Sequence, residues 1–106
     1  MRPSADLIFK SLADPTRRSI FEQLSRDRGA TVRRLTERAG VSQPAVSKHL
    51  RLLRETGLVR AERQGRETHY TANARGLAPL FGWLEYHSAF WEDRFDRLDA
   101  LLKKMK

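Results

Sequence analysis

The chain has 106 residues, which suits one domain of ordinary size and leaves no room for a second, catalytic domain. Its composition, 40% hydrophobic and 32% charged, is globular, and the lack of cysteine excludes disulfides and thiolate chemistry. Lysine and arginine outnumber aspartate and glutamate by 21 to 13, and most of the excess lies in residues 1–72. This charge favours a polyanionic partner over a merely soluble basic protein. With a charged N-terminal stretch and no apolar run of the ~18–20 residues that span a membrane, we expect a cytoplasmic protein without membrane contact.

The first third of the chain predicts three helices. Residues 4–12 place apolar side chains at helical spacing. Asp14 followed by Pro15 is a helix start, with aspartate as the N-cap and proline in the first turn. This second helix is expected to run to about residue 24. A third helix is expected over residues 31–39, because a threonine precedes its apolar positions and a glycine follows them.

The fourth helix is expected over residues 42–56, from the N-cap Ser42 to the stop at Gly57. Only a few residues around Gly40 separate it from the third helix. Two short helices joined by such a tight glycine-containing turn are typical of a helix-turn-helix, which is therefore predicted over residues 31–56. The predicted inward stripe of the fourth helix is Val46, Leu50 and Leu53.

After the helix-turn-helix the hydrophobic period changes. Residues 58–72 alternate in two β-compatible runs around a polar, basic turn at residues 64–66, which indicates a β-hairpin. Residues 77–105 are helical in pattern again, with apolar side chains in two strips. The predicted fold is mainly α with a β-hairpin wing (α+β): a winged helix-turn-helix of about five helices in one domain, residues 1–106.

The outer face of the fourth helix carries the residue types that contact DNA. A hydroxyl, an amide, a methyl group and cations gather near its N-terminal end, from which a recognition helix reaches base edges in the major groove. The basic hairpin adds arginines suited to phosphates, and Arg66 at the turn is suited to the minor groove. A solvated helix face and a solubilising hairpin are the structural alternatives. The candidate DNA-binding residues are Ser42, Gln43, Pro44, Ala45, Ser47, Lys48, His49, Arg51, Arg63 and Arg66.

The last helix has more aromatic residues than one side of a small core needs. Its wide apolar face indicates a partner subunit, with helix 4–12 as the companion element. A two-fold dimer would place two recognition helices one DNA turn apart, about 34 Å. Alternatively, these aromatic residues serve the core of one chain or line a ligand pocket. The candidate dimer-interface residues are Ile8, Phe9, Leu12, Trp83, Leu84, Phe90, Trp91, Phe95 and Leu98.

The three histidines share no metal-ligand spacing. We expect His49 either at a phosphate or in a hydrogen-bonded structural role, His69 packed or facing solvent, and His87 solvated or at an interface. Neither a Ser/His/Asp arrangement nor a phosphate loop nor a pair of carboxylates is readable. The sequence therefore predicts no metal site, no cofactor and no enzymatic activity.

Three segments resemble the ArsR (ArsR/SmtB) family of bacterial winged-helix transcriptional regulators: LADPTRR at residues 12–18, VSQPAVSKHLRLL at 41–53 and GLV at 57–59. The resemblance covers nearly the whole chain and implies a homodimer built on the first and last helices and repression by operator binding. Metal-sensing members carry a cysteine motif in the third helix or an acidic and histidine set on the last helix. This sequence has neither, and residues 83–98 are similar to the branch whose genes often neighbour a START-type protein.

The predicted function is that of a sequence-specific transcriptional regulator, a dimeric repressor. It binds double-stranded DNA at a near-palindromic operator through helix 42–56 and the basic wing. One alternative is a sensor whose aromatic helices bind an unknown small-molecule effector, and another is a winged helix that binds a protein. A third is the dimerisation domain of a methyltransferase, which would need a separate catalytic chain. Repression or activation depends on where the DNA site lies relative to the promoter.

Overall fold

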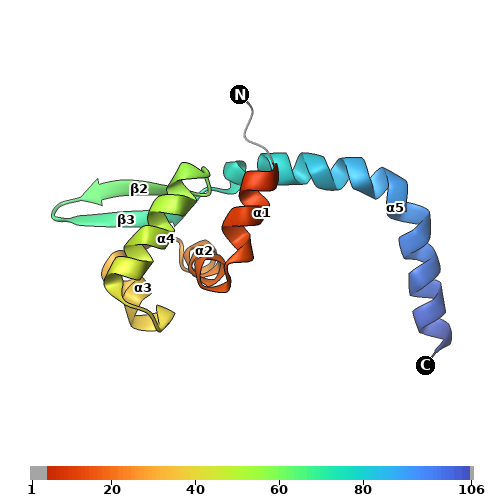
Figure 1. The fold of residues 1–106 in the computed structure, drawn as a ribbon, viewed down its shortest axis with the longest axis horizontal. Coiled ribbons are helices and arrows are strands. Elements are labelled where there is room, and N and C mark those ends of the chain that lie inside the picture. The colour runs from red at the N-terminus through yellow and green to blue at the C-terminus, as the bar shows by residue number, and fades with distance from the viewer. Residues whose placement is uncertain (1–4, 106) are drawn as a thin grey trace.

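The computed structural model describes residues 5–105, and of Asp93 only the backbone, so the expected helix start at residue 4 lies outside the described part. Figure 1 shows a winged helix-turn-helix with a long C-terminal helix, which confirms the predicted fold class. The five expected helices are present as α-helices, and a short 3-10 helix and a third strand add to them. In chain order the elements are α1 (Ala5–Ala13), α2 (Pro15–Asp27), β1 (Ala30–Thr31), α3 (Val32–Ala39), α4 (Gln43–Glu55), β2 (Val59–Gln64), β3 (Glu67–Ala72), η1 (Ala74–Leu77) and α5 (Ala78–Lys104).

Three helices begin at the residues that the sequence predicts as N-caps. The side chains of Asp14, Thr31 and Ser42 accept hydrogen bonds from the backbone N–H three residues on, at 2.9, 3.3 and 3.3 Å. The expected end of the second helix near residue 24 is wrong, because α2 has no breaker there and continues for another turn. It ends at Asp27, and the C-cap Arg28 has a φ of 58°, in the left-handed region.

Two adjacent arginines at the start of α2 hold the end of α1. The last carbonyls of a helix lack donors within the helix. Arg17 donates from Nε to the carbonyl of Ser11 and from Nη2 to that of Lys10, the second at 3.2 Å. Arg18 donates from Nη1 to the carbonyl of Leu12 at 2.9 Å. The two guanidinium groups therefore supply donors to the end of α1 and attach it to α2.

The core lies where the first four helices meet the base of the wing. It includes the predicted inward stripe of α4, so the direction in which this helix faces is confirmed. The buried apolar side chains are Ile8, Ile20, Leu24, Ala30, Leu35, Val46, Leu50, Leu53, Leu58 and Val59.

The wing is part of a three-stranded antiparallel sheet in the order β1-β3-β2. Strands β2 and β3 pair from Val59 opposite Ala72 to Gln64 opposite Glu67, which leaves a two-residue turn. Gly65 opens that turn with a φ of 65°, as a tight hairpin requires. The unpredicted strand β1 pairs with β3 and ties the start of α3 to the wing. Two residues are too few for any strand periodicity to be read from the sequence.

The 3-10 helix η1 fixes the start of α5 to the junction between α4 and β2. The side-chain amide of Asn73 donates to the carbonyl of Gly57 at 2.9 Å, and its backbone N–H donates to the carbonyl of Leu58 at 2.8 Å. Gly76 approaches the same segment so closely that an added Cβ would lie 2.1 Å from the Gly57 oxygen. From this anchor α5 extends away from the other helices, and its second half turns in another direction (Figure 1). Within residues 5–105 no helix is both long and apolar enough to cross a membrane.

Candidate nucleic-acid interface

The predicted DNA-contact face of α4 is open to solvent. Because the core holds one side of the helix, the opposite side is left for a partner. Ala45 and His49, on the flanks, are half-buried. The exposed members of the predicted set are Ser42, Gln43, Pro44, Ser47, Lys48 and Arg51.

The N-terminal end of α4 is arranged to meet an anion or a base edge. Ser42 uses an oxygen lone pair to accept the N–H of Ala45 at 3.3 Å, so its hydroxyl proton remains a donor. The first N–H groups of a helix and its dipole both favour phosphate at this end. Gln43, the next residue, presents an amide that can donate and accept at the same time.

The cations of α4 and the wing are not committed to acids. The ion pairs among the described side chains join Arg33 to Glu37, Arg38 to Asp27 and Lys103 to Asp99, on other elements. In the wing, Arg63 donates from Nε to the carbonyl of Gly65 at 3.3 Å and so lies over the turn. Arg66 lies in the turn and is exposed. Lys48, Arg51, Arg63 and Arg66 thus form a set of cations on the two elements that a winged helix places on DNA.

His49 has a hydrogen-bond partner that the sequence did not indicate. Arg17 Nη1 lies 3.4 Å from His49 Nδ1, which supports the structural one of its two expected roles. Asp14 lies beside this contact. The backbone N–H of Arg17 lowers the pKa of the Asp14 carboxyl, and the positive charge of the Arg17 guanidinium group acts in the same direction. Arg17 is the residue missed, because its partner is 32 positions away in the sequence.

The residues predicted to form the dimer interface differ in how far they are buried. Ile8 is only 1% exposed and belongs to the core of its own chain, so its expected place on a dimer surface is corrected. Leu12 is half-buried against that core. The others are exposed, from 42% for Trp83 to 71% for Phe90. These exposed residues are Phe9, Trp83, Leu84, Phe90, Trp91, Phe95 and Leu98.

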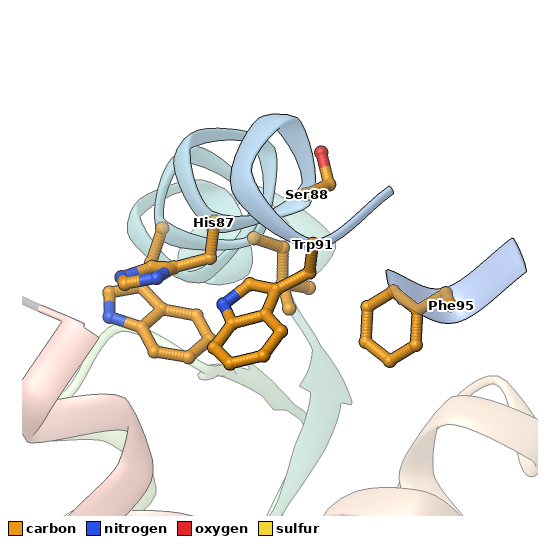
Figure 2. Close-up of a pocket in the computed structure, with 6 residues that line it drawn as sticks. His87, Ser88, Trp91 and Phe95 are labelled. Carbon is orange, nitrogen blue, oxygen red and sulfur yellow. The ribbon is translucent and has the colours of Figure 1, made fainter. Parts of the chain in front are cut away.

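The exposed aromatic residues form a continuous surface from α1 onto α5. The rings of Phe9 and Trp83 meet edge to face with centroids 5.2 Å apart, and Trp83 lies 4.2 Å from the His87 ring. A hollow of about 460 Å³ lies along this face of α5. Figure 2 shows His87, Trp91 and Phe95 projecting from the same side of the helix, whereas the Ser88 hydroxyl points away. The lining residues are Trp83, Leu84, His87, Ser88, Trp91 and Phe95.

The three histidines lie on three different elements: His49 on α4, His69 on β3 and His87 on α5. Of residues 5–105, no group of three histidine, aspartate or glutamate side chains is placed to hold a metal ion. His69 is half-buried between Thr31 of β1 and Glu62 of β2 in the register of the sheet.

A winged helix-turn-helix with an open cationic recognition helix defines a class of DNA-binding protein, and known proteins of this class match the chain. Residues 12–62 match the Helix-turn-helix domain family. The Bacillus subtilis (strain 168) protein "Transcriptional repressor SdpR" is 30% identical over 77 residues, 73% of this chain and 84% of that protein. The solved "ArsR-like Transcriptional Regulator from Rhodococcus sp. RHA1" has a TM-score of 0.72 and 32% identity, over 91% of this chain and 90% of that one.

A third match is the solution structure of a winged helix-turn-helix domain of Mb0332 from Mycobacterium bovis, whose description calls it homodimeric. It has a TM-score of 0.63 and 25% identity, and the match covers 80% of this chain and 78% of that one. The chain belongs to the ArsR family of helix-turn-helix transcriptional regulators.

Proposed function

We propose that the protein is a cytoplasmic, homodimeric repressor that binds a near-palindromic DNA operator through α4 and the wing. The observation that carries this proposal is the exposed face of α4, where a capped N-terminal end and free cations lie opposite a fully buried stripe. Gln43 and Ser47 lie where base edges are read, and Lys48 and Arg51 where phosphates pass. A dimer bound across a promoter would block transcription, and the similar protein SdpR is a repressor by name.

The shape of the chain supports the homodimer. Its radius of gyration is 17.4 Å, whereas a compact domain of this length has about 13 Å. The difference arises from α5, which carries its exposed aromatic face away from the core of its own chain. Apolar surface of this extent is covered in stable proteins, and a second copy presents a matching surface under two-fold symmetry. The homodimeric Mb0332 domain has the same fold.

The residues of α3 and α5 support placement in the branch that senses no metal and whose genes often neighbour a START-type protein. Arg33 and Arg34 occupy the first turn of α3, where the resemblance implies cysteine in metal-sensing members, and α5 carries a single histidine, His87, in its sequence. The hollow on the aromatic face of α5 favours a second candidate function, a regulator gated by an apolar small molecule. A thermal-shift screen against apolar metabolites and divalent metals separates the two, since only a gated regulator is stabilised by a metabolite.

DNA affinity is expected to fall steeply with salt. If the four cations in the predicted DNA-binding set contact phosphates in both protomers, the slope of log K against log salt is about −7. These cations are Lys48, Arg51, Arg63 and Arg66. Fluorescence anisotropy with DNA from upstream of the protein's own gene, and with a shuffled control, measures this slope. Preference for the upstream probe establishes a sequence-specific autoregulator, and equal binding to both calls for selection from random DNA. A protein that binds neither probe at low salt contradicts the proposal and favours a protein-binding winged helix.

Substitutions at the start of α4 separate base contacts from helix stability. Ser42→Asp keeps an N-cap acceptor, so the thermal midpoint should hold while the new negative charge repels DNA. Gln43→Ala should cost ~1–3 kcal/mol of operator binding and relax the base preference at one position. Selection from a randomised site library with each variant measures both effects. An unchanged base preference for Gln43→Ala would remove Gln43 from the readout.

A further inference from the structure

One side chain connects three helices at the back of the recognition helix. Arg17, at the start of α2, donates to two carbonyls at the end of α1 and reaches His49 on α4. Its own backbone N–H is held by the Asp14 cap at 2.9 Å. The position of its guanidinium group is therefore set from α1 and α2 before it meets α4.

Beside the shared apolar core, the boundary between α1 and α4 is open. A hollow of about 250 Å³ lies there, with Leu7 and Lys10 on one side and Leu52 and Thr56 on the other. Arg17 lines this hollow, and its Nη1 lies 3.4 Å from His49 Nδ1 on α4. We call the contact between Arg17 and His49 the bridge. Because α1 also contacts α5 through Phe9 and Trp83, the bridge lies between the aromatic surface and α4, the helix proposed to read DNA.

The bridge determines which ring nitrogen of His49 carries the proton. A guanidinium group has donors only, so His49 Nδ1 must accept, which requires the neutral ring with its proton on Nε2. The Nε2–H then remains a donor on a half-buried flank of α4. The ring plane is fixed by a partner that is itself anchored at two carbonyls.

We infer that Arg17 is a positioning residue for DNA binding, which acts through His49 to hold α4 at a set orientation against α1. This inference rests on the proposed function. It assigns to Arg17 an effect on DNA affinity although no part of its side chain lies on the exposed face of α4.

The neighbouring arginine provides a matched control. Arg18 also donates to a carbonyl at the end of α1, but it is exposed and its bond goes to Leu12 alone. Arg17→Gln and Arg18→Gln remove the same charge and each weaken the end of α1. Only Arg17→Gln removes the bridge to α4.

The test measures DNA affinity by anisotropy and the thermal midpoint by circular dichroism for both variants in the full chain. Both are expected to lower the midpoint, whereas Arg17→Gln weakens DNA binding about tenfold more than Arg18→Gln. Arg17→Lys keeps the positive charge but lacks the planar guanidinium group, so it should not restore DNA affinity.

Variants of His49 leave the hydrogen bonds at the end of α1 intact. They therefore test the same contact if Arg17→Gln does not fold. His49→Asn keeps an acceptor near the Nδ1 position, so it should bind DNA about tenfold more tightly than His49→Phe, which has none.

Equal DNA affinities for Arg17→Gln and Arg18→Gln overturn the inference, since charge alone then explains both losses. Equal affinities for His49→Asn and His49→Phe also overturn it. In a double-mutant cycle, Arg17→Gln with His49→Phe should be no weaker than either single variant, and additive losses count against the bridge. Failure of the wild-type protein to bind any DNA would instead reject the proposed function itself, and this inference with it.

Discussion

Gly76→Ala is expected to lower the free energy of unfolding by about 3 kcal/mol, at the upper end of the range for overpacking. A Cβ at this position would lie 2.1 Å from the oxygen and 2.7 Å from the carbonyl carbon of Gly57, and 3.1 Å from the Cα of Leu58. All three atoms are backbone, so no side chain can turn aside to make room. The 3-10 helix must therefore leave the junction of α4 and β2. Urea denaturation followed by circular dichroism, at several protein concentrations, measures the change.

Gly82→Ala is the matched control for that experiment. A Cβ at Gly82 would meet nothing within 4 Å, and the residue lies inside α5. Alanine in a helix interior is favoured over glycine by up to ~1 kcal/mol, so this variant should be as stable as wild type or more so. If the two glycine variants unfold alike, η1 is not anchored against Gly57 in the way described.

Phe95→Lys is expected to separate the protomers and to weaken operator binding more than ~100-fold. Phe95 is 62% exposed in the single chain and lines the aromatic hollow of α5. A lysine there would bring an unpaired charge into the proposed apolar interface. When two recognition helices are held in one dimer, binding of the first raises the effective concentration of the second and so increases the overall DNA affinity. This increase is lost when each protomer binds alone. Sedimentation velocity measures the oligomeric state, and anisotropy measures the affinity.

Ala89→Lys adds the same charge on the opposite face of α5. At 100° per residue Ala89 shares a side with Glu85, Glu92 and Asp96. The residues that line the hollow lie on the other side. This variant should remain a dimer and bind the operator as wild type does. Because both substitutions add one positive charge, a loss confined to Phe95→Lys cannot come from the change in net charge. A dimeric Phe95→Lys protein would place the interface elsewhere.

The features that local chemistry determines were predictable from the sequence. Asp14, Thr31 and Ser42 were read as N-caps because their oxygens serve N–H groups only three residues away. The inward face of α4 followed from the 3.6-residue period of its apolar positions. The exposed faces of α4 and α5 could also be predicted, because they are the sides of each helix that do not face the core.

The features that depend on contacts between distant residues were not predictable. The Arg17–His49 contact joins residues 32 positions apart, and no spacing rule connects an arginine after one N-cap with a histidine on another helix. Strand β1 exists only because β3 lies beside it. Ile8 and Phe9 are adjacent in the sequence and both apolar, so composition could not tell which one faces the core. That choice depends on how α1 lies against its neighbours.

The order of the core along the chain determines the order of assembly during synthesis. Among the residues that the structure describes, the ten buried apolar side chains run from Ile8 to Val59, and the aromatic face of α5 comes after them. Protein domains fold as units while translation proceeds, at ~5–20 residues per second. The core of the chain can therefore close while α5 is still leaving the ribosome. If two copies pair through α5 as proposed, each chain has folded its core before that helix is available for pairing.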